Sequence, residues 1–110
     1  MINKNSISAA HSTYDVEAEC IKKAKEYFDE KAFSKAVMLL KNAERIGTSG
    51  CGHSGIACQH FAHLMCCCER PARFISPAEA VHGGSGYLKK DDVMLFASRG
   101  GKTAELMPIL

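Results

Sequence analysis

Two turns rich in glycine and hydroxyl residues constrain the fold of this sequence most, because each stands between a strand pattern and a helix pattern. The first, "GTSGCGHSG" at residues 47–55, follows a weak strand candidate that carries a single isoleucine. The second, "SRGGKT" at residues 98–103, follows the apolar run 93–97 and leads into a helix expected near Thr103. Strand, turn and helix in repeated order are typical of an α/β domain with a parallel sheet.

The sequence before these turns has helical patterns. Residues 1–12 are polar, and we expect them to be frayed. Apolar residues recur at helical spacing from Tyr14, and a second apolar stripe covers residues 33–43. The short polar joint between the two stripes predicts an antiparallel helical pair. We therefore expect a helical segment over 1–44 and an α/β domain over 45–110.

Local signals predict the remaining elements. A helix is expected over residues 56–68 and a short strand at "ARFIS". Another helix is expected to start with Ser76 as its N-cap and Pro77 in the first helical position. Glu79 stands where a capping box places its carboxylate. The continuously apolar run 93–97 predicts a strand that is covered on both faces.

Composition and charge narrow the range of partners. The 110 residues are 46% apolar, and 14 basic and 12 acidic side chains give a net charge of +2. This apolar fraction is normal for a globular protein, and the balanced charge predicts no nucleic-acid partner. The sequence has no apolar run long enough to cross a bilayer and no signal-peptide core, so we expect no membrane partner and a cytoplasmic location.

Six cysteines raise the question of disulfides or metal ligands. Cys66, Cys67 and Cys68 are consecutive, and without a secretion signal we expect reduced, buried thiols that act as small apolar side chains. His63 lies one helical turn before Cys66, but a structural zinc site takes paired ligands from a second element, so we predict no metal and no cofactor. Cys51 precedes a helix N-terminus, where thiols become reactive, although a space-filling role is favoured.

Both turns are expected at the carboxyl ends of their strands, where α/β sheets bind ligands. Glycines allow a ligand to approach the backbone, and the free N–H groups of a helix N-terminus attract anions. Hydroxyl groups and cations are also available there, from Thr48, Ser49, Ser54, Ser98, Thr103, Arg99 and Lys102. A phosphate monoester fits such a place. A purely structural role stays open, since the first turn matches neither the P-loop nor the dinucleotide pattern.

Three segments in this order, "SGCGHSG", "SPAEAVHGGSG" and "SRGGKT", resemble motifs of the sugar isomerase (SIS) domain, above all those of its arabinose-5-phosphate isomerase branch. The resemblance covers the chain from about Arg45 to its end. It implies a flavodoxin-like three-layer α/β/α sandwich with a parallel sheet, of which residues 45–110 form the N-terminal part, preceded by the helical pair. It also implies a sugar phosphate ligand and a homo-oligomer, either a dimer or a tetramer.

The resemblance implies roles for particular residues. The sugar phosphate would be held by Ser49, Gly52, Ser54, Ser98, Arg99, Gly100 and Thr103. His82 matches a family histidine near the sugar and His53 replaces a family lysine, so these histidines are the candidate acid–base groups for aldose–ketose isomerisation through an enediol. Lys102 replaces a family glutamate. Apart from the resemblance, Glu105 is expected mainly as a first-turn carboxylate that the helix dipole favours, and a role as base is its secondary interpretation.

Other functions stay open at this point. The family domain continues beyond Leu110, so we expect a truncated or remnant SIS domain with bare apolar surface and a tendency to self-associate. One alternative is a non-catalytic sensor of phosphosugars. Another is a structural fragment that pairs only with copies of itself.

Overall fold

The structure is a computed structural model that describes residues 3–110, and the chain divides into two compact units, Met1–Ala36 and Val37–Leu110. The first unit contains α1 (Lys4–Ala24), the 3-10 helix η1 (Lys25–Tyr27) and the first half of α2 (Glu30–Asn42). In the part of the chain that the structure describes, no helix is long and apolar enough to span a membrane.

Helix α1 begins earlier than its apolar pattern predicted. Asn3 is the N-cap, and its side-chain oxygen accepts a hydrogen bond from the N–H of Ser6 at 2.8 Å. This bond satisfies one of the N–H groups that a helix leaves free at its start. The expectation of a frayed first dozen residues is therefore wrong from Lys4 onward, while residues 1 and 2 lie outside the described residues.

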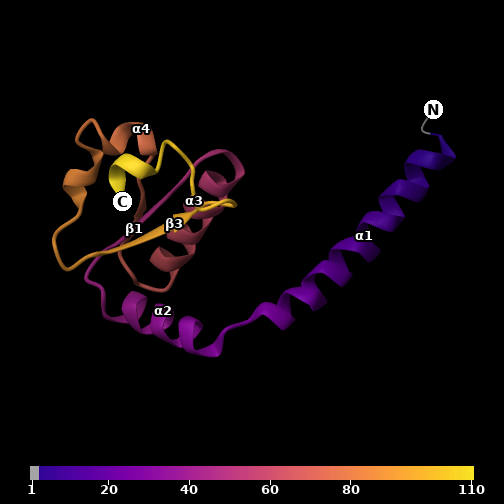
Figure 1. Cartoon of the computed structure of the whole chain (residues 1–110), viewed down its shortest axis with the longest axis horizontal. Coiled ribbons are helices and arrows are strands. Elements are labelled where there is room, and N and C mark those ends of the chain that lie inside the picture. Colours follow the sequence, from indigo (N-terminus) through magenta and orange to yellow (C-terminus); the bar gives the residue numbers. More distant parts are fainter. Residues whose placement is uncertain (1–2) are drawn as a thin grey trace. The chain divides into compact units, whose positions relative to one another are not determined.

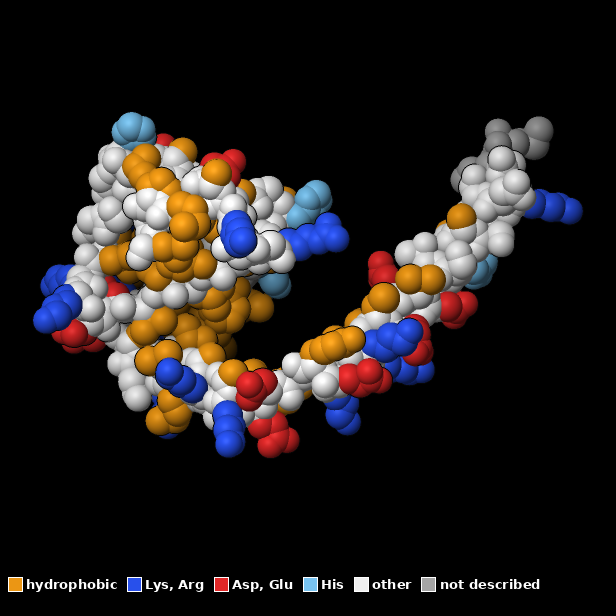
Figure 2. Space-filling model, in the orientation of Figure 1, with side chains coloured by type: hydrophobic (Ala, Val, Ile, Leu, Met, Phe, Trp, Pro, Cys, Tyr) orange, Lys and Arg blue, Asp and Glu red, His pale blue; other side chains and the backbone are white. Residues whose placement is uncertain are grey.

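The apolar stripes of α1 and α2 lie on the surface. Every residue of α1 is exposed, and so are the residues of α2 apart from the half-buried Leu40. Figure 2 shows hydrophobic side chains in a row along α1. The expected antiparallel pairing of the two helices stays a prediction, because α2 runs across the boundary between the two units. The rings of Phe28 and Phe33 make a local contact at the joint, with centroids 4.9 Å apart.

The second unit is built on a parallel sheet, which the described residues form in the strand order β2-β1-β3 (Figure 1). The strands are β1 (Ile46–Gly50), β2 (Ala72–Phe74) and β3 (Val93–Ala97). Between them in the chain lie α3 (Gly52–Cys67), α4 (Pro77–Ala80) and the 3-10 helix η2 (Gly84–Tyr87). The predicted α/β sandwich with a parallel sheet is confirmed, and β3 has the bounds that the sequence predicted.

The polar strand is central and the apolar strand lies at an edge. All five residues of β1 are buried, whereas all five of β3 are half-buried, so the expectation that β3 is covered on both faces is wrong. Thr48 Oγ1 donates to the carbonyl of Cys58 at 2.9 Å. Ser49 Oγ donates to the carbonyl of Ile75 at 2.7 Å. Because hydrogen-bonded hydroxyls can be buried, a strand with one isoleucine can form the centre of the sheet.

Glycine lets α3 begin directly against the end of β1. A Cβ atom on Gly55 would lie 2.6 Å from the carbonyl oxygen of Gly50, a distance that real Cβ atoms do not show. Gly52, the first residue of α3, has a φ of 55°, which favours glycine. The helix therefore starts four residues before the predicted Ile56, and its N-terminus lies at the carboxyl end of the central strand.

The chain after β3 forms a turn and the 3-10 helix η3 (Met107–Ile109) instead of the helix expected near Thr103. Pro108 supplies the reason. Proline has no N–H to donate, and in an α-helix its ring would meet the carbonyl four residues earlier, at Ala104. The second glycine turn therefore does not lead into a helix N-terminus.

The start of α4 agrees with the sequence in part. Ser76 is the N-cap and Pro77 occupies the first helical position, as predicted. Within the described residues, however, the Ser76 side chain makes no capping hydrogen bond, so the expected capping box with Glu79 is not formed.

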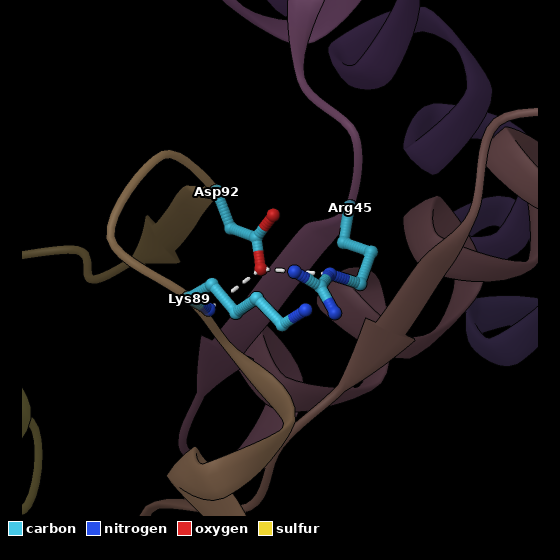
Figure 3. A network of polar contacts seen from close by, with 3 residues as sticks. All are labelled: Arg45, Lys89 and Asp92. Carbon is cyan, nitrogen blue, oxygen red and sulfur yellow. Dashed lines mark hydrogen bonds and ion pairs between the residues drawn. The ribbon is translucent and has the colours of Figure 1, made fainter.

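An ion pair ties the segment before β1 to the segment before β3, at the amino end of both strands (Figure 3). Arg45 Nε lies 2.9 Å from Asp92 Oδ2, and the same oxygen accepts the N–H of Lys89 at 2.7 Å. Burial of the Asp92 carboxylate acts to raise its pKa, but the N–H of Lys89 and the guanidinium of Arg45 outweigh this effect. The pKa of Asp92 is therefore lowered.

Candidate functional site

The two glycine turns leave the sheet next to each other. The strand register pairs Gly50, the last residue of β1, with Ala97, the last residue of β3. The expectation that both turns lie at the carboxyl ends of neighbouring strands is confirmed. The second turn is closed by its own side chains, since the hydroxyl oxygens of Ser98 and Thr103 are 2.7 Å apart.

Helix α3 presents an uncapped N-terminus at this edge of the sheet. The N–H of Gly55 donates to the carbonyl of Cys51 at 3.3 Å, which starts the helical ladder. The three preceding N–H groups, those of residues 52–54, come before the first such bond and have no intrahelical acceptor. Cys51 is the N-cap, and its side chain makes no capping hydrogen bond to any described residue. A helix of 16 residues places the positive end of its dipole here, so this N-terminus favours an anion.

A pocket of about 630 Å³ opens beside this helix N-terminus. Its volume is in the range of small-molecule sites. The first turns of α3, the end of β2, α4 and the segment after β3 all contribute to its walls. The apolar walls include Phe74 and Val81, and the polar groups come from Gln59, Ser76 and Glu105. The pocket therefore combines apolar walls, a few polar groups and exposed backbone N–H groups, the usual composition of a ligand site.

The predicted phosphosugar residues of the first turn lie in different environments. Gly52 lines the pocket. Ser54 is half-buried in the first turn of α3. Ser49 is 0% exposed and its hydroxyl is engaged by Ile75, so a contact with a ligand would require that bond to break.

The predicted residues of the second turn form a separate group beside the pocket. Ser98 and Thr103 are half-buried and bonded to each other, while Arg99 and Gly100 are exposed. Lys102 is also exposed, so two cations extend from the tip of this turn. Among the described residues that line the pocket, the second turn contributes none, although it leaves the sheet opposite Gly50.

The two candidate acid–base histidines are on the surface. His53 lies in the first turn of α3 and His82 follows α4, and both are exposed. Within residues 3–110, neither histidine lines the pocket, whereas Glu105 does. The structure therefore places Glu105, the secondary candidate base, in the pocket wall and both candidate histidines outside that wall.

Sequence reasoning missed Gln59, and a usable signal was present. Gln59 follows Gly52 by seven residues and Gly55 by four, a spacing that puts all three on one face of a helix. All three line the pocket. Ser76 was predicted only as a helix cap, and its place at the pocket depends on how α4 packs, which the local sequence does not show.

The cysteines differ from the expected buried cluster. Each of the six, all within the described residues, carries a free thiol, but Cys66, Cys67 and Cys68 are exposed. Cys58 is buried, and burial raises the pKa of its thiol despite hydrogen bonds with the backbone of Ala97 and Ser49 that act to lower it. Over the described part of the chain, no three His, Cys, Asp or Glu side chains lie close enough to hold a metal ion.

A parallel α/β sheet with a glycine turn and a pocket at the carboxyl ends of its strands defines a ligand-binding domain of the doubly wound class. The chain belongs to the SIS domain family, which it matches over residues 39–109.

Particular relatives agree with this assignment. The chain is 31% identical over 108 residues to arabinose 5-phosphate isomerase KdsD of Pseudomonas aeruginosa, covering 98% of this chain and 33% of the relative. A solved structure from Listeria monocytogenes, described as a candidate sugar-phosphate isomerase, matches with a TM-score of 0.91 and 37% identity, covering 99% of this chain and 58% of that one.

A second solved structure, an Escherichia coli protein in complex with arabinose 5-phosphate, matches with a TM-score of 0.88 and 27% identity. The match covers 100% of this chain and 58% of that one. The chain therefore spans about a third of the length of the curated relatives it matches.

Proposed function

We propose that this chain binds a sugar phosphate in the pocket beside α3. The observation that carries the proposal is the uncapped N-terminus of α3, whose free N–H groups lie next to a pocket of about 630 Å³. Such N–H groups and the helix dipole bind phosphate in many proteins. Membership of the SIS family and the likeness to a protein solved in complex with arabinose 5-phosphate support the choice of ligand.

The phosphate would lie against the N–H groups of Gly52, His53 and Ser54, with the Ser54 hydroxyl as a further donor. The second turn would close over the phosphate from the adjacent strand, where Arg99 and Lys102 supply positive charge. The sugar would extend into the pocket toward Gln59, Ser76 and Glu105, whose polar groups can bond to its hydroxyls. This arrangement separates a phosphate-binding end of the site, with its N–H groups and cations, from a sugar-binding end, which holds Glu105.

We propose aldose–ketose isomerisation as the reaction. A base removes the proton on C2 of the aldose and the C1 carbonyl oxygen gains a proton, which gives the enediol. C1 then gains a proton as the C2 hydroxyl loses one, which gives the ketose. Glu105 is the best-placed base because its side chain lines the pocket. His53 and His82, which are exposed and outside the pocket wall, stay candidates for the proton exchange at the oxygens.

Binding and turnover are tested by two measurements on the same protein. Titration calorimetry with arabinose 5-phosphate should show saturable heat, whereas arabinose without the phosphate should show none. An assay for the ketose product then tests catalysis, and Glu105→Gln should lower kcat with little change in binding. If arabinose 5-phosphate and inorganic phosphate both fail to bind, the proposal is wrong.

A non-catalytic phosphosugar sensor is the second candidate. The composition of the pocket wall favours this candidate. Among the described residues that line the pocket, Glu105 is the one carboxylate and no histidine is present. Enediol chemistry needs a donor as well as an acceptor of protons. Saturable binding without any ketose formation would support the sensor over the isomerase.

A further inference from the structure

The pocket face of α3 has glycine near the helix N-terminus and a polar side chain further along. Among its described residues, α3 contributes Gly52, Gly55 and Gln59 to the pocket wall. A Cβ atom at Gly52 would meet no described atom within 4 Å, and Gly55 packs directly against the Gly50 carbonyl. A ligand that lies along this face from the helix N-terminus passes two glycines, and the first side chain of α3 that it meets is that of Gln59.

The length of helix between these residues sets the distance of Gln59 from the phosphate end of the site. An α-helix rises about 1.5 Å per residue, so Gln59 lies about 10 Å along the axis from Gly52. Helical side chains lean toward the N-terminus, which brings the carboxamide back toward the free N–H groups. A phosphate held by those N–H groups lies beyond the helix end, and this offset acts in the opposite direction. The carboxamide is therefore about 10 Å from the phosphorus position.

The length of an open-chain pentose phosphate matches this distance. Seven bonds separate the phosphorus of arabinose 5-phosphate from its C1 oxygen, and an extended chain advances about 1.2 Å per bond, which gives about 8–9 Å. A hydrogen bond of about 2.9 Å spans what remains. Glycolaldehyde phosphate has the same phosphate and carbonyl but a chain of two carbons, so its carbonyl oxygen ends about 5 Å from the phosphorus and cannot reach the carboxamide.

We propose that the Gln59 carboxamide contacts the C1 oxygen of the open-chain sugar phosphate and selects a five-carbon chain over shorter ones. The inference rests on the proposed function, because it starts from a phosphate bound at the N-terminus of α3. A carboxamide N–H can donate to the carbonyl oxygen of the aldose, and the carboxamide oxygen can accept from the adjacent C2 hydroxyl. Negative charge grows on the C1 oxygen as a base removes the C2 proton, and a fixed N–H donor stabilises that charge.

Gln59 fits this role better than the other polar side chains of the pocket wall. An ionised Glu105 accepts hydrogen bonds and has none to donate. Ser76 is the N-cap of α4, and its hydroxyl has a single proton to donate. The side chain of Gln59 is exposed and carries a donor and an acceptor side by side, as the C1 and C2 oxygens of the aldose require.

A series of ligands of different length tests the contact. Gln59 is the only glutamine of the sequence, and comparison with Gln59→Leu identifies its side-chain signals in nitrogen–proton NMR spectra. The full chain is titrated with arabinose 5-phosphate, glycolaldehyde phosphate and inorganic phosphate. We expect the backbone amides of residues 52–54 to shift with all three ligands and the Gln59 side-chain signals to shift with arabinose 5-phosphate alone.

The same titrations distinguish a failure of this inference from a failure of the proposed function. If the amides of residues 52–54 shift with none of the ligands, the phosphate site is wrong and the inference falls with it. If those amides shift with arabinose 5-phosphate while the Gln59 side chain does not, the inference alone is wrong. A Gln59 shift of equal size with glycolaldehyde phosphate would also overturn it.

A matched pair of variants tests the contribution of the carboxamide to affinity. Gln59→Leu keeps the approximate size of the side chain and removes its donor and acceptor. We expect it to weaken binding of arabinose 5-phosphate about three- to tenfold and to leave the affinity for inorganic phosphate unchanged. His60→Leu alters the next residue, which is exposed and not among the described lining residues, so this control should bind both ligands normally. Unchanged affinity of Gln59→Leu for arabinose 5-phosphate, or an equal loss for inorganic phosphate, would overturn the proposal.

Discussion

The hydroxyl oxygens of Ser98 and Thr103 lie 2.7 Å apart and close the turn that follows β3. This contact holds the turn in shape without a helix behind it, since the chain beyond Thr103 forms a turn and a 3-10 helix. The exposed Arg99 and Lys102 belong to this closed turn, which leaves the sheet next to the turn that leads into α3. The second half of the proposed phosphate site is therefore arranged before a ligand arrives, which reduces the ordering cost of binding.

Replacement of the Ser98 hydroxyl should weaken ligand binding. On the proposal that the Ser98 hydroxyl also donates to the phosphate, we expect Ser98→Ala to weaken binding of arabinose 5-phosphate roughly 10- to 100-fold, because a hydrogen bond to a charged group contributes about 1.5–3 kcal/mol. Calorimetry measures the change, and Ser34→Ala, an exposed serine on α2, is the matched control that should bind normally. Unchanged affinity in Ser98→Ala would remove this turn from the site.

The close approach of α3 to β1 predicts a large effect of one methyl group. In Gly55→Ala the new Cβ would lie 2.6 Å from the Gly50 carbonyl oxygen. Relief of such overpacking costs about 1–3 kcal/mol, which exceeds the roughly 1 kcal/mol that alanine gains over glycine in a helix. We expect the free energy of unfolding in urea to fall by about that difference or more, and phosphate binding to weaken with it.

Gly86→Ala is the matched control for this substitution. A Cβ at Gly86 meets no atom of the described chain within 4 Å, so stability should stay within about 0.5 kcal/mol of the original. If Gly55→Ala behaves like Gly86→Ala, the helix N-terminus can move away from the strand, and the fixed geometry of the phosphate site would be wrong.

The ion pair at the amino end of the sheet predicts a loss of stability in acid. The pKa of Asp92 is lowered from its ordinary value of 3.8, so its stabilising effect is complete above that pH and is lost as the pH falls through the lowered pKa. Asp92→Asn should have a lower urea midpoint than the original chain at pH 7, and the difference should shrink below about pH 3.8. Asp91→Asn, with an exposed side chain, should match the original chain at both pH values.

The buried thiol predicts a loss of stability in base. Burial raises the pKa of Cys58 above its ordinary value of 9.0, so the folded state resists forming the thiolate. The unfolded chain gives up this proton more readily, and the stability should fall as the pH rises above about 9. Between pH 7 and pH 10, the urea midpoint of Cys58→Ala should fall less than the midpoint of the original chain. Cys20→Ala, at an exposed position on α1, should keep the full decrease.

Local chemistry predicted the elements whose signals are local. The five apolar residues of β3 and the serine–proline start of α4 lie where the sequence put them. The early start of α1 depends on Asn3, a cap that precedes the apolar pattern. The missing helix after β3 was also a local matter, because Pro108 was visible and outweighs the helical start at Thr103.

Long-range contacts decided the rest. The burial of β1 depends on Thr48 and Ser49 finding carbonyl partners 10 and 26 residues away in the chain. The place of β3 at an edge depends on strand order, which its composition did not reveal. At the site, the turns and their adjacency were predictable, whereas the approach of Glu105 to the pocket follows from the fold of the chain after β3.

The most direct test of phosphate binding at α3 is a titration of the nitrogen-15-labelled chain with arabinose 5-phosphate. The amide chemical shifts in nitrogen–proton NMR spectra monitor the titration. We predict that the amides of Gly52, His53 and Ser54 shift most and in step, with saturation, and that arabinose leaves them unchanged. Saturable shifts confined to other residues, or no shifts with either sugar, would contradict the account.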